Sequence, residues 1–165
     1  GTLLIDELSK KEGFASLKVS GKTDSWGTLG IKYDSPGTWN LAGYSSIGVW
    51  VKCNESALFS ITLVDCYGGS RTFWGIEAEG SSATTGWKRF VVNLTDYSSQ
   101  TPDFIINSVD YINLFVYSKP GKGLSFWVDD LTVDTSLDLE KFVYKGRVPV
   151  DEPVVAYFYS CREDG

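Results

Sequence analysis

The stretch SFWVDDLTV, from Ser125 to Val133, decides the fold of this chain. Its composition is that of a β-strand, because Phe, Trp, Val, Leu and Thr are favoured on a pleated sheet. Two adjacent carboxylates, Asp129 and Asp130, lie in the middle of it. Successive residues of a strand point to opposite faces, so we expect one of the two to face inward or toward a neighbouring strand.

A carboxylate in such an apolar strand needs compensation. A bare buried charge costs several kcal/mol, and a calcium ion is the simplest partner for an oxygen-rich site. The alternative is that Asp129 and Asp130 are ordinary carboxylates that face solvent or nearby Lys and Arg side chains.

The rest of the chain continues the strand pattern, with almost no helical periodicity. Apolar residues alternate with a period of two, and Gly, Ser, Asn and Asp interrupt them about every 8–12 residues. Many short strands separated by turn residues predict an all-β fold, a β-sandwich jelly roll of two antiparallel sheets. We expect strands near residues 2–8, 14–20, 28–34, 46–53, 58–66, 71–77, 87–94, 111–118 and 124–134.

Aromatic residues make up 15% of the chain, more than a sandwich core requires. Large aromatic side chains left exposed usually mark a binding surface, and flat rings on a rigid sheet suit the apolar face of a sugar. The alternative is that these rings pack beneath loops or between layers.

The alternation predicts which aromatic rings are spare. Val49 and Val51 are expected in the core, which turns Trp50 to the other side. Trp74 and Glu77 share a strand of ambiguous phase, so we expect one of them to join the spare group. Trp26 lies in the loop-rich segment GKTDSWGTLG. The strand near 111–118 contributes the outward-facing residues Asn113, Phe115 and Tyr117.

Composition excludes several functions. The formal net charge is −6, which disfavours nucleic acid, since affinity there depends on basic contacts to phosphate. The chain has no histidine, so Ser-His-Asp and Cys-His catalysis and His-ligated zinc are excluded. No apolar run approaches the roughly 18 residues of a membrane span, so we expect no membrane insertion.

Three cysteines are present, Cys53, Cys66 and Cys161, and an odd count leaves one unpaired in a monomer. Cys53 and Cys66 flank what reads as a β-hairpin with its turn at residues 54–57. In that geometry the two lie roughly 26 Å apart at about 3.3 Å per residue, too far for a disulfide. We therefore expect both to be free thiols, and leave the state of Cys161 open.

Residues 1–134 are predicted to form one sandwich domain. Residues 135–165 differ in character, with a linker-like segment KGRVPVDEP followed by the strand-like VVAYFYS. We interpret them as a linker, an extra strand or the start of a following domain.

Several segments together resemble jelly-roll carbohydrate-binding modules. SLKVSGKTDSWG (16–27) is similar to families 4, 9 and 22, whereas GYSSIGVWVK, GWKRFVVNLTDY and VDYINLFVY resemble family 11. The resemblance implies two opposed sheets, one of them a concave glycan-binding surface, and a galactose-binding-like fold. It also implies a structural calcium ion, held by Asp6 or Glu7 near the first strand and by Asp129, and it makes Trp26 a ligand-binding position.

From these observations we predict a non-catalytic module that binds polysaccharide, with a β-glucan-type chain as the leading candidate. We expect it to be a monomeric, extracellular part of a larger protein that targets an appended glycoside hydrolase to its substrate. The predicted stacking residues are Trp26, Trp50, Trp74 and Tyr117, and the predicted hydrogen-bonding residues are Asn113 and Glu77.

Two other classes of function stay open on the sequence. One is a jelly-roll glycosidase, which would need two carboxylates across a cleft. Glu77 and Glu79 share one strand face and could supply them, although EAEG is not a usual glycosidase motif. A lyase would instead need a Tyr or Lys base. The fold also resembles galactose-binding-like domains that bind partner proteins without glycan specificity, and fold alone does not settle function.

Overall fold

The computed structural model describes residues 1–76 and 86–134. This part contains ten strands and one short 3-10 helix, η1 (Ile106–Ser108), which precedes β9. The strands are β1 (Thr2–Asp6), β2 (Ser16–Lys22), β3 (Thr28–Trp39), β4 (Ser46–Cys53), β5 (Leu58–Asp65), β6 (Ser70–Ile76), β7 (Lys88–Asn93), β8 (Ser99–Gln100), β9 (Val109–Tyr117) and β10 (Gly123–Asp134).

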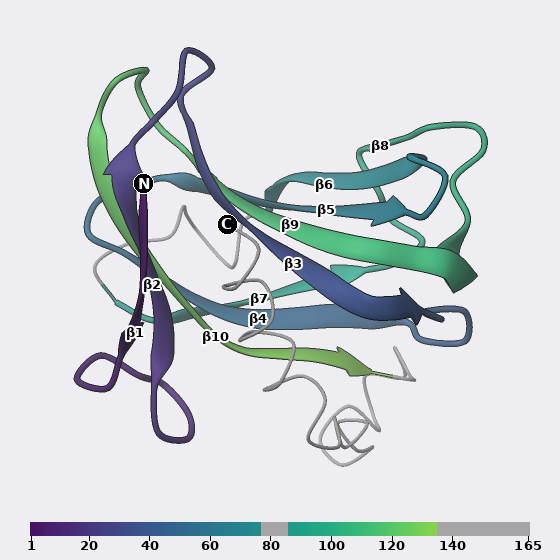
Figure 1. Cartoon of the computed structure of the whole chain (residues 1–165), viewed down its shortest axis with the longest axis horizontal. Helices are drawn as coiled ribbons and strands as arrows, with labels where there is room; N and C mark the ends of the chain where they lie inside the picture. Colours follow the sequence, from purple (N-terminus) through teal and green to yellow (C-terminus); the bar gives the residue numbers. More distant parts are fainter. Residues whose placement is uncertain (77–85, 135–165) are drawn as a thin grey trace.

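The strands form two five-stranded sheets that pack face to face (Figure 1). The first sheet has the order β1-β2-β10-β4-β7 and the second has the order β3-β9-β5-β6-β8. All strand pairs of the described residues are antiparallel. The all-β sandwich predicted from the alternation is therefore confirmed.

The core lies between the sheets and follows the predicted phase. Val49 and Val51 of β4 are fully buried, as is Leu114 of β9 in the opposite sheet. Phe59 and Phe90 join the two layers, with ring centroids 4.9 Å apart at a tilt of 48°, a geometry that aromatic pairs favour. The outer faces of both sheets are thus left to the alternate residues, and these decide what each face can bind.

The predicted hairpin at residues 54–57 is wrong. β4 belongs to the first sheet and β5 to the second, so this connection crosses the sandwich. Asn54 holds the crossing to β10, because its side-chain oxygen accepts the Ser125 N–H at 2.8 Å. Cys53 and Cys66 are free thiols as predicted, and burial raises the pKa of Cys53. Cys161 lies outside the described residues.

Two further features were not predicted. β3 continues to Trp39 through Pro36, which an edge strand tolerates because that side needs no ladder donor. β8 has only two residues, too few to show a period. No helix of the described ranges is long and apolar enough to cross a lipid bilayer. Residues 135–165 lie outside those ranges, so their role stays a prediction.

Candidate functional site

The outer face of the second sheet carries an aromatic row along β9. Its alternate residues Tyr111, Asn113, Phe115 and Tyr117 are only partly buried, whereas the residues between them lie in the core. β9 is an interior strand of the sheet, between the edge strand β3 and the middle strand β5. We call this surface, with Trp74 of β6, the aromatic face.

Three aromatic rings gather at one end of the aromatic face. The ring centroids of Trp74 and Tyr117 are 5.1 Å apart, and those of Phe115 and Tyr117 are 6.3 Å apart. Trp74 is 53% exposed. Phe73 of β6 is buried opposite Ile61 of β5, so alternation turns Trp74 outward, onto the face that carries the row on β9. The cluster is a preformed, solvent-facing aromatic platform.

Gly30 on β3 makes room for this platform. A Cβ atom at Gly30 would lie 2.2 Å from a ring carbon of Phe115 and 2.9 Å from the Leu114 carbonyl oxygen. The Phe115 ring therefore packs directly on the backbone of the neighbouring strand, which only glycine permits. The sequence contains this signal, a glycine inside a strand, but not its partner.

A polar row crosses the aromatic face next to the rings. Asn113 is opposite Lys32 on one side and Thr62 on the other, and Thr62 is opposite Thr72. The two threonine hydroxyls are 3.1 Å apart. Within residues 1–76 and 86–134 the Asn113 amide makes no side-chain hydrogen bond, so both of its polar atoms are available to a ligand.

Two other polar groups on this face have defined electrostatics. Lys32 forms an ion pair with Asp34 and lies 4.3 Å from the ring centroid of Tyr111. The hydrogen bond to Asp34 raises the pKa of Lys32. Burial raises the pKa of Tyr117 above its ordinary value near 10. Its hydroxyl therefore stays protonated at neutral pH and can donate a hydrogen bond.

Trp26 lies at the end of the same sheet, in the turn that leads into β3. Asp24 holds the turn, because its side chain accepts the N–H groups of Trp26 and Thr28 at 2.9 and 2.8 Å and the Thr28 hydroxyl at 2.6 Å. These bonds lower the pKa of Asp24. Thr28 is opposite Tyr117 in the sheet, and Trp26 is 85% exposed. An ordered turn thus presents a bare indole next to the aromatic face.

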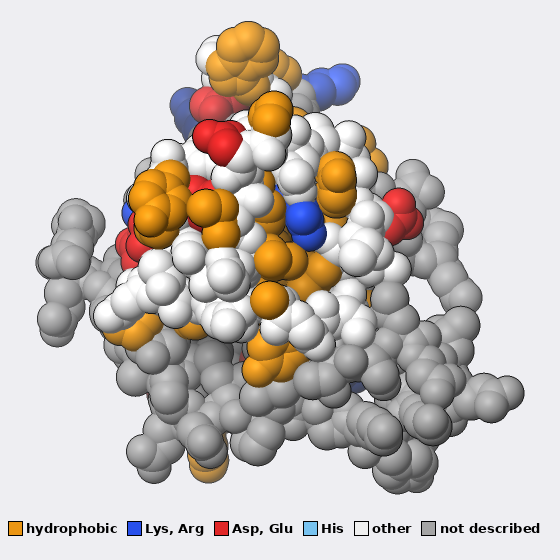
Figure 2. Space-filling model, turned by 90° about the vertical axis from the view of Figure 1, so that its right-hand side faces the viewer, with side chains coloured by type: hydrophobic (Ala, Val, Ile, Leu, Met, Phe, Trp, Pro, Cys, Tyr) orange, Lys and Arg blue, Asp and Glu red, His pale blue; other side chains and the backbone are white. Residues whose placement is uncertain are grey.

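Arg71 fixes the other end of β6. Its guanidinium donates to the Gln100 side chain and to the Leu94 carbonyl, each at 2.6 Å, and it lies 4.8 Å from the ring centroid of Tyr97. Burial lowers its pKa. Figure 2 shows this end of the sandwich, where hydrophobic side chains lie among other side chains and backbone, with Lys or Arg and Asp or Glu side chains between them. Sequence reasoning missed this clamp because its partners Leu94 and Gln100 lie 23 and 29 residues from Arg71 along the chain.

Trp50 does not join the aromatic face. It lies on β4 in the first sheet, so it faces out on the opposite side of the sandwich. There the Lys11 ammonium lies 4.3 Å from its ring centroid and the Arg89 guanidinium 5.9 Å from it. The predicted outward phase of Trp50 is confirmed, but its predicted grouping with Trp74 is wrong, because periodicity does not say which sheet a strand enters.

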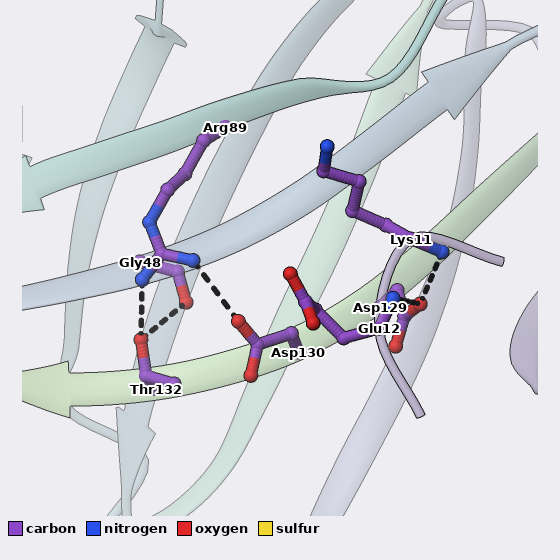
Figure 3. A network of polar contacts seen from close by, with 7 residues as sticks. All are labelled: Lys11, Glu12, Gly48, Arg89, Asp129, Asp130 and Thr132. Atoms are coloured by element: carbon purple, nitrogen blue, oxygen red, sulfur yellow. Dashed lines mark hydrogen bonds and ion pairs between the residues drawn. The ribbon is translucent and has the colours of Figure 1, made fainter. Parts of the chain in front are cut away.

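Asp129 and Asp130 both lie on the outer side of the first sheet (Figure 3). A β-bulge follows Asp129, and Asp130 there has a φ of +50°. The extra residue of a bulge breaks strict alternation. Of the two orientations expected for one carboxylate, inward or toward a neighbouring strand, the inward one is therefore wrong for both. Asp130 pairs with Arg89 at 3.1 Å, and Arg89 also donates to the Thr132 hydroxyl at 2.8 Å.

Two of the predicted calcium ligands, Asp129 and Asp6, accept hydrogen bonds from N–H groups. Asp129 accepts the backbone N–H groups of Lys11 and Glu12 at 2.8 and 2.9 Å (Figure 3). Asp6 accepts the indole N–H of Trp127 at 2.7 Å, and this bond is the main cause that lowers its pKa.

These groups fit a cation poorly, because N–H donors aim at the oxygens that a metal would need. Glu7 is exposed, and in the described part of the chain no three His, Cys, Asp or Glu side chains group closely enough to hold a metal ion. Calcium binding by Asp6, Glu7 and Asp129 stays a prediction.

The structure therefore brings part of the predicted site together. Trp74, Asn113 and Tyr117 share the aromatic face and Trp26 stands at its end, whereas Trp50 is on the other sheet. Glu77 lies outside the described residues. The face also includes polar and aromatic residues that the sequence did not single out: Lys32, Thr62, Thr72 and Tyr111.

Comparison with known proteins finds similarity in structure but not in sequence. No protein-family model and no curated protein matches the sequence. The family 30 carbohydrate-binding module of a cellulosomal cellulase of Clostridium thermocellum aligns with a TM-score of 0.62 at 21% identity, over 83% of both chains.

Two more solved structures extend this result. A family 11 module of Clostridium thermocellum in complex with a β-1,3-1,4-mixed-linked tetrasaccharide aligns with a TM-score of 0.56 at 19% identity, over 82% of this chain and 84% of that one. An exo-β-agarase aligns at 0.60 and 11% identity, over 82% of this chain and 22% of the enzyme. The chain has the β-sandwich fold of carbohydrate-binding modules of families 11 and 30. The sequence resemblance implied the jelly-roll fold and named family 11, but it did not name family 30.

Proposed function

We propose that this chain is a non-catalytic module that binds polysaccharide on its aromatic face. The observation that carries the proposal is the cluster of Trp74, Tyr117 and Phe115, whose rings meet on the outside of a sheet rather than in the core. Soluble proteins seldom expose such a cluster unless it binds something. The fold supports the same function, since modules that bind carbohydrate share it.

The face offers both contacts that a sugar chain requires. Aromatic rings pack against the apolar side of a pyranose, a contact worth about 0.5–1.5 kcal/mol beyond the buried area in aromatic pairs. The polar row beside them presents the Asn113 amide and the Thr62 and Thr72 hydroxyls to the sugar hydroxyls. The Tyr117 hydroxyl, protonated at neutral pH, adds a donor.

A neutral β-glucan-type chain is the ligand we propose. Lys32, the charged side chain of the polar row, forms an ion pair with Asp34 of the same strand. The side chains left to meet the ligand are therefore uncharged. The family 11 structure with a mixed-linked glucan tetrasaccharide supports this class. In the cellulosomal cellulase and the agarase the corresponding fold is one part of a larger enzyme, which supports an extracellular role beside a glycoside hydrolase.

The proposal is tested by calorimetry against a panel of soluble β-glucans, mannans and xylans. Trp74→Ala should weaken binding by about 1–3 kcal/mol, as truncation of an interface anchor does. Trp50→Ala is the matched control, because it removes the same side chain from the opposite sheet and should leave this affinity unchanged. Circular dichroism on both variants checks that the fold persists.

Two outcomes would overturn the proposal. If the wild type binds none of the polysaccharides, the aromatic face is better explained as a contact for a partner protein. If Trp50→Ala abolishes glucan binding and Trp74→Ala does not, the binding surface is on the first sheet.

A further inference from the structure

A lysine-tryptophan-lysine row crosses the outer face of the first sheet. In β10, Trp127 is directly opposite Lys18 of β2 on one side and Lys52 of β4 on the other. The two ammonium groups lie 4.9 and 4.8 Å from the centroid of the same indole ring. We call the outer face of the first sheet around this row the lysine face.

The ammonium groups of the lysine face have no carboxylate of their own. In residues 1–76 and 86–134, Lys11, Lys18 and Lys52 form no ion pair. The carboxylates beside the row, Asp6 and Asp129, instead accept N–H groups. Asp6 accepts the Trp127 indole N–H at 2.7 Å and two backbone N–H groups, and Asp129 accepts the backbone N–H groups of Lys11 and Glu12. On Trp50, next to the row, Lys11 adds a third ammonium 4.3 Å from a ring centroid.

The lysine pair is held in place before any ligand arrives. A cation is attracted to the face of an indole ring, and Lys52 also donates to the Ser9 hydroxyl at 2.8 Å. Lys18, Lys52 and Trp127 are all partly buried, which restricts the lysine stems. Ordered side chains lose less entropy on binding, so the pair is suited to an anion.

The position of the row favours a glycan over a peptide. A peptide joins a sheet by adding a strand at an edge, whereas Trp127 lies on the central strand of this sheet with Lys18 and Lys52 on the strands to either side. The next outward row carries the hydroxyls of Ser20 and Ser125, 2.8 Å apart, which can bond to sugar hydroxyls.

We infer that the lysine face is a second binding surface, which takes an anionic polysaccharide bearing carboxylate or sulfate groups. The acid groups lie between Lys18 and Lys52, and the sugar hydroxyls meet the Ser20–Ser125 row. The inference uses none of the residues of the aromatic face, so it can be tested independently of the proposed function.

Calorimetry of the whole chain at low ionic strength tests this inference with matched probes. The probes are polygalacturonate, dextran sulfate, neutral dextran and polyglutamate. The wild type should bind polygalacturonate, dextran sulfate or both, and should not bind dextran; which of them binds tells carboxylate from sulfate. Binding should weaken as salt rises toward 0.15 M, where the screening length is about 8 Å.

A double variant with a charge-matched control locates the surface. Lys18→Gln with Lys52→Gln should weaken binding of the anionic glycan at least about tenfold, since each lysine makes a charge-assisted contact. Lys32→Gln with Lys119→Gln removes the same charge from the second sheet and from the loop between β9 and β10, and should change it little. Trp74→Ala should leave it unchanged while it weakens glucan binding.

The inference is overturned if the wild type binds neither anionic glycan, or if the two double variants lose affinity equally. Equal or tighter binding of polyglutamate also overturns it, because the surface would then be a site for acidic peptides.

Discussion

At the scale of single residues, Asp65 shows how one carboxylate organises an end of the sandwich. It is 2% exposed and accepts the backbone N–H groups of Ile105, Tyr67 and Gly69 at 2.7, 2.8 and 2.9 Å. Burial alone would raise the pKa of Asp65, but these hydrogen bonds outweigh it and lower the pKa. The turn between β5 and β6 and the segment before η1 are thereby fixed to one point.

Asp65 should give the fold part of its acid sensitivity. A lowered folded-state pKa contributes stability above the unfolded value of about 3.9, and this stability is lost as the pH falls through the folded value. Asp65→Asn should therefore cost about 1–3 kcal/mol at pH 7, because it leaves buried N–H donors without an acceptor. Urea titration across pH should show the gap from wild type closing below about pH 4.

The exposed carboxylate Asp103 offers the control for that measurement. Asp103→Asn should leave both the stability and its pH dependence close to wild type. A gap for Asp65→Asn that persists unchanged at pH 3 would show that its effect is steric and not due to ionisation.

At the scale of elements, β3 shows how one glycine in a strand supports the aromatic face. Gly30, near the start of β3, leaves room for the Phe115 ring of β9, and the strand is at the edge of the sheet. The shape of the aromatic face therefore depends on a strand that contributes no aromatic ring there.

Gly30→Ala should disturb both stability and glucan binding. The new Cβ would overlap the Phe115 ring and crowd the Leu114 carbonyl, and such overpacking costs about 1–3 kcal/mol. Gly37→Ala in the same strand is the control, because its Cβ would meet nothing within 4 Å. Thermal melting and calorimetry should separate the two variants; equal melting temperatures would show that Phe115 relaxes without cost.

Sequence periodicity could predict elements but not their partners. All nine strands that it indicated are present, since burial on one face imposes a period of two. Periodicity could not assign β4 and β5 to different sheets. The same short connecting sequence can form a hairpin within one sheet or cross from one sheet to the other. The separation of Trp50 from Trp74 follows from that one ambiguity.

The sequence could predict only those residues of the candidate site whose position follows from the inward–outward alternation along one strand. Asn113 and Tyr117 were found because they alternate with core residues of the interior strand β9. Lys32 and Thr72 were missed because they join the face through register between strands, and register is set by pairing in three dimensions. The bulge beside Asp129 was missed because a local irregularity leaves no periodic trace.

At the scale of the whole molecule, the sandwich presents two outer faces of different chemistry. The aromatic face combines rings with uncharged polar groups. The lysine face combines rings with ammonium groups that form no ion pair within the described residues. The loop between β1 and β2 folds back onto the lysine face, where the N–H groups of Lys11 and Glu12 meet Asp129 near the end of the described chain.

Asp129→Asn should lower the melting temperature even in EDTA, because the variant loses a charged acceptor for the loop's N–H groups. Differential scanning calorimetry of wild type and variant, each with EDTA and with excess calcium, separates this tether from a metal site. A calcium-dependent rise confined to the wild type would support calcium binding by Asp6, Glu7 and Asp129. Equal melting with and without calcium would overturn that prediction.

The bulge at Asp130 also changes the parity of β10. Before it, the even-numbered residues Phe126 and Val128 face the core; after it, the odd-numbered Leu131 and Val133 pack against the core instead. Removal of one residue here would restore a single parity and turn half of the strand's apolar side chains to the outside. The length of SFWVDDLTV is therefore fixed by the fold as firmly as its composition.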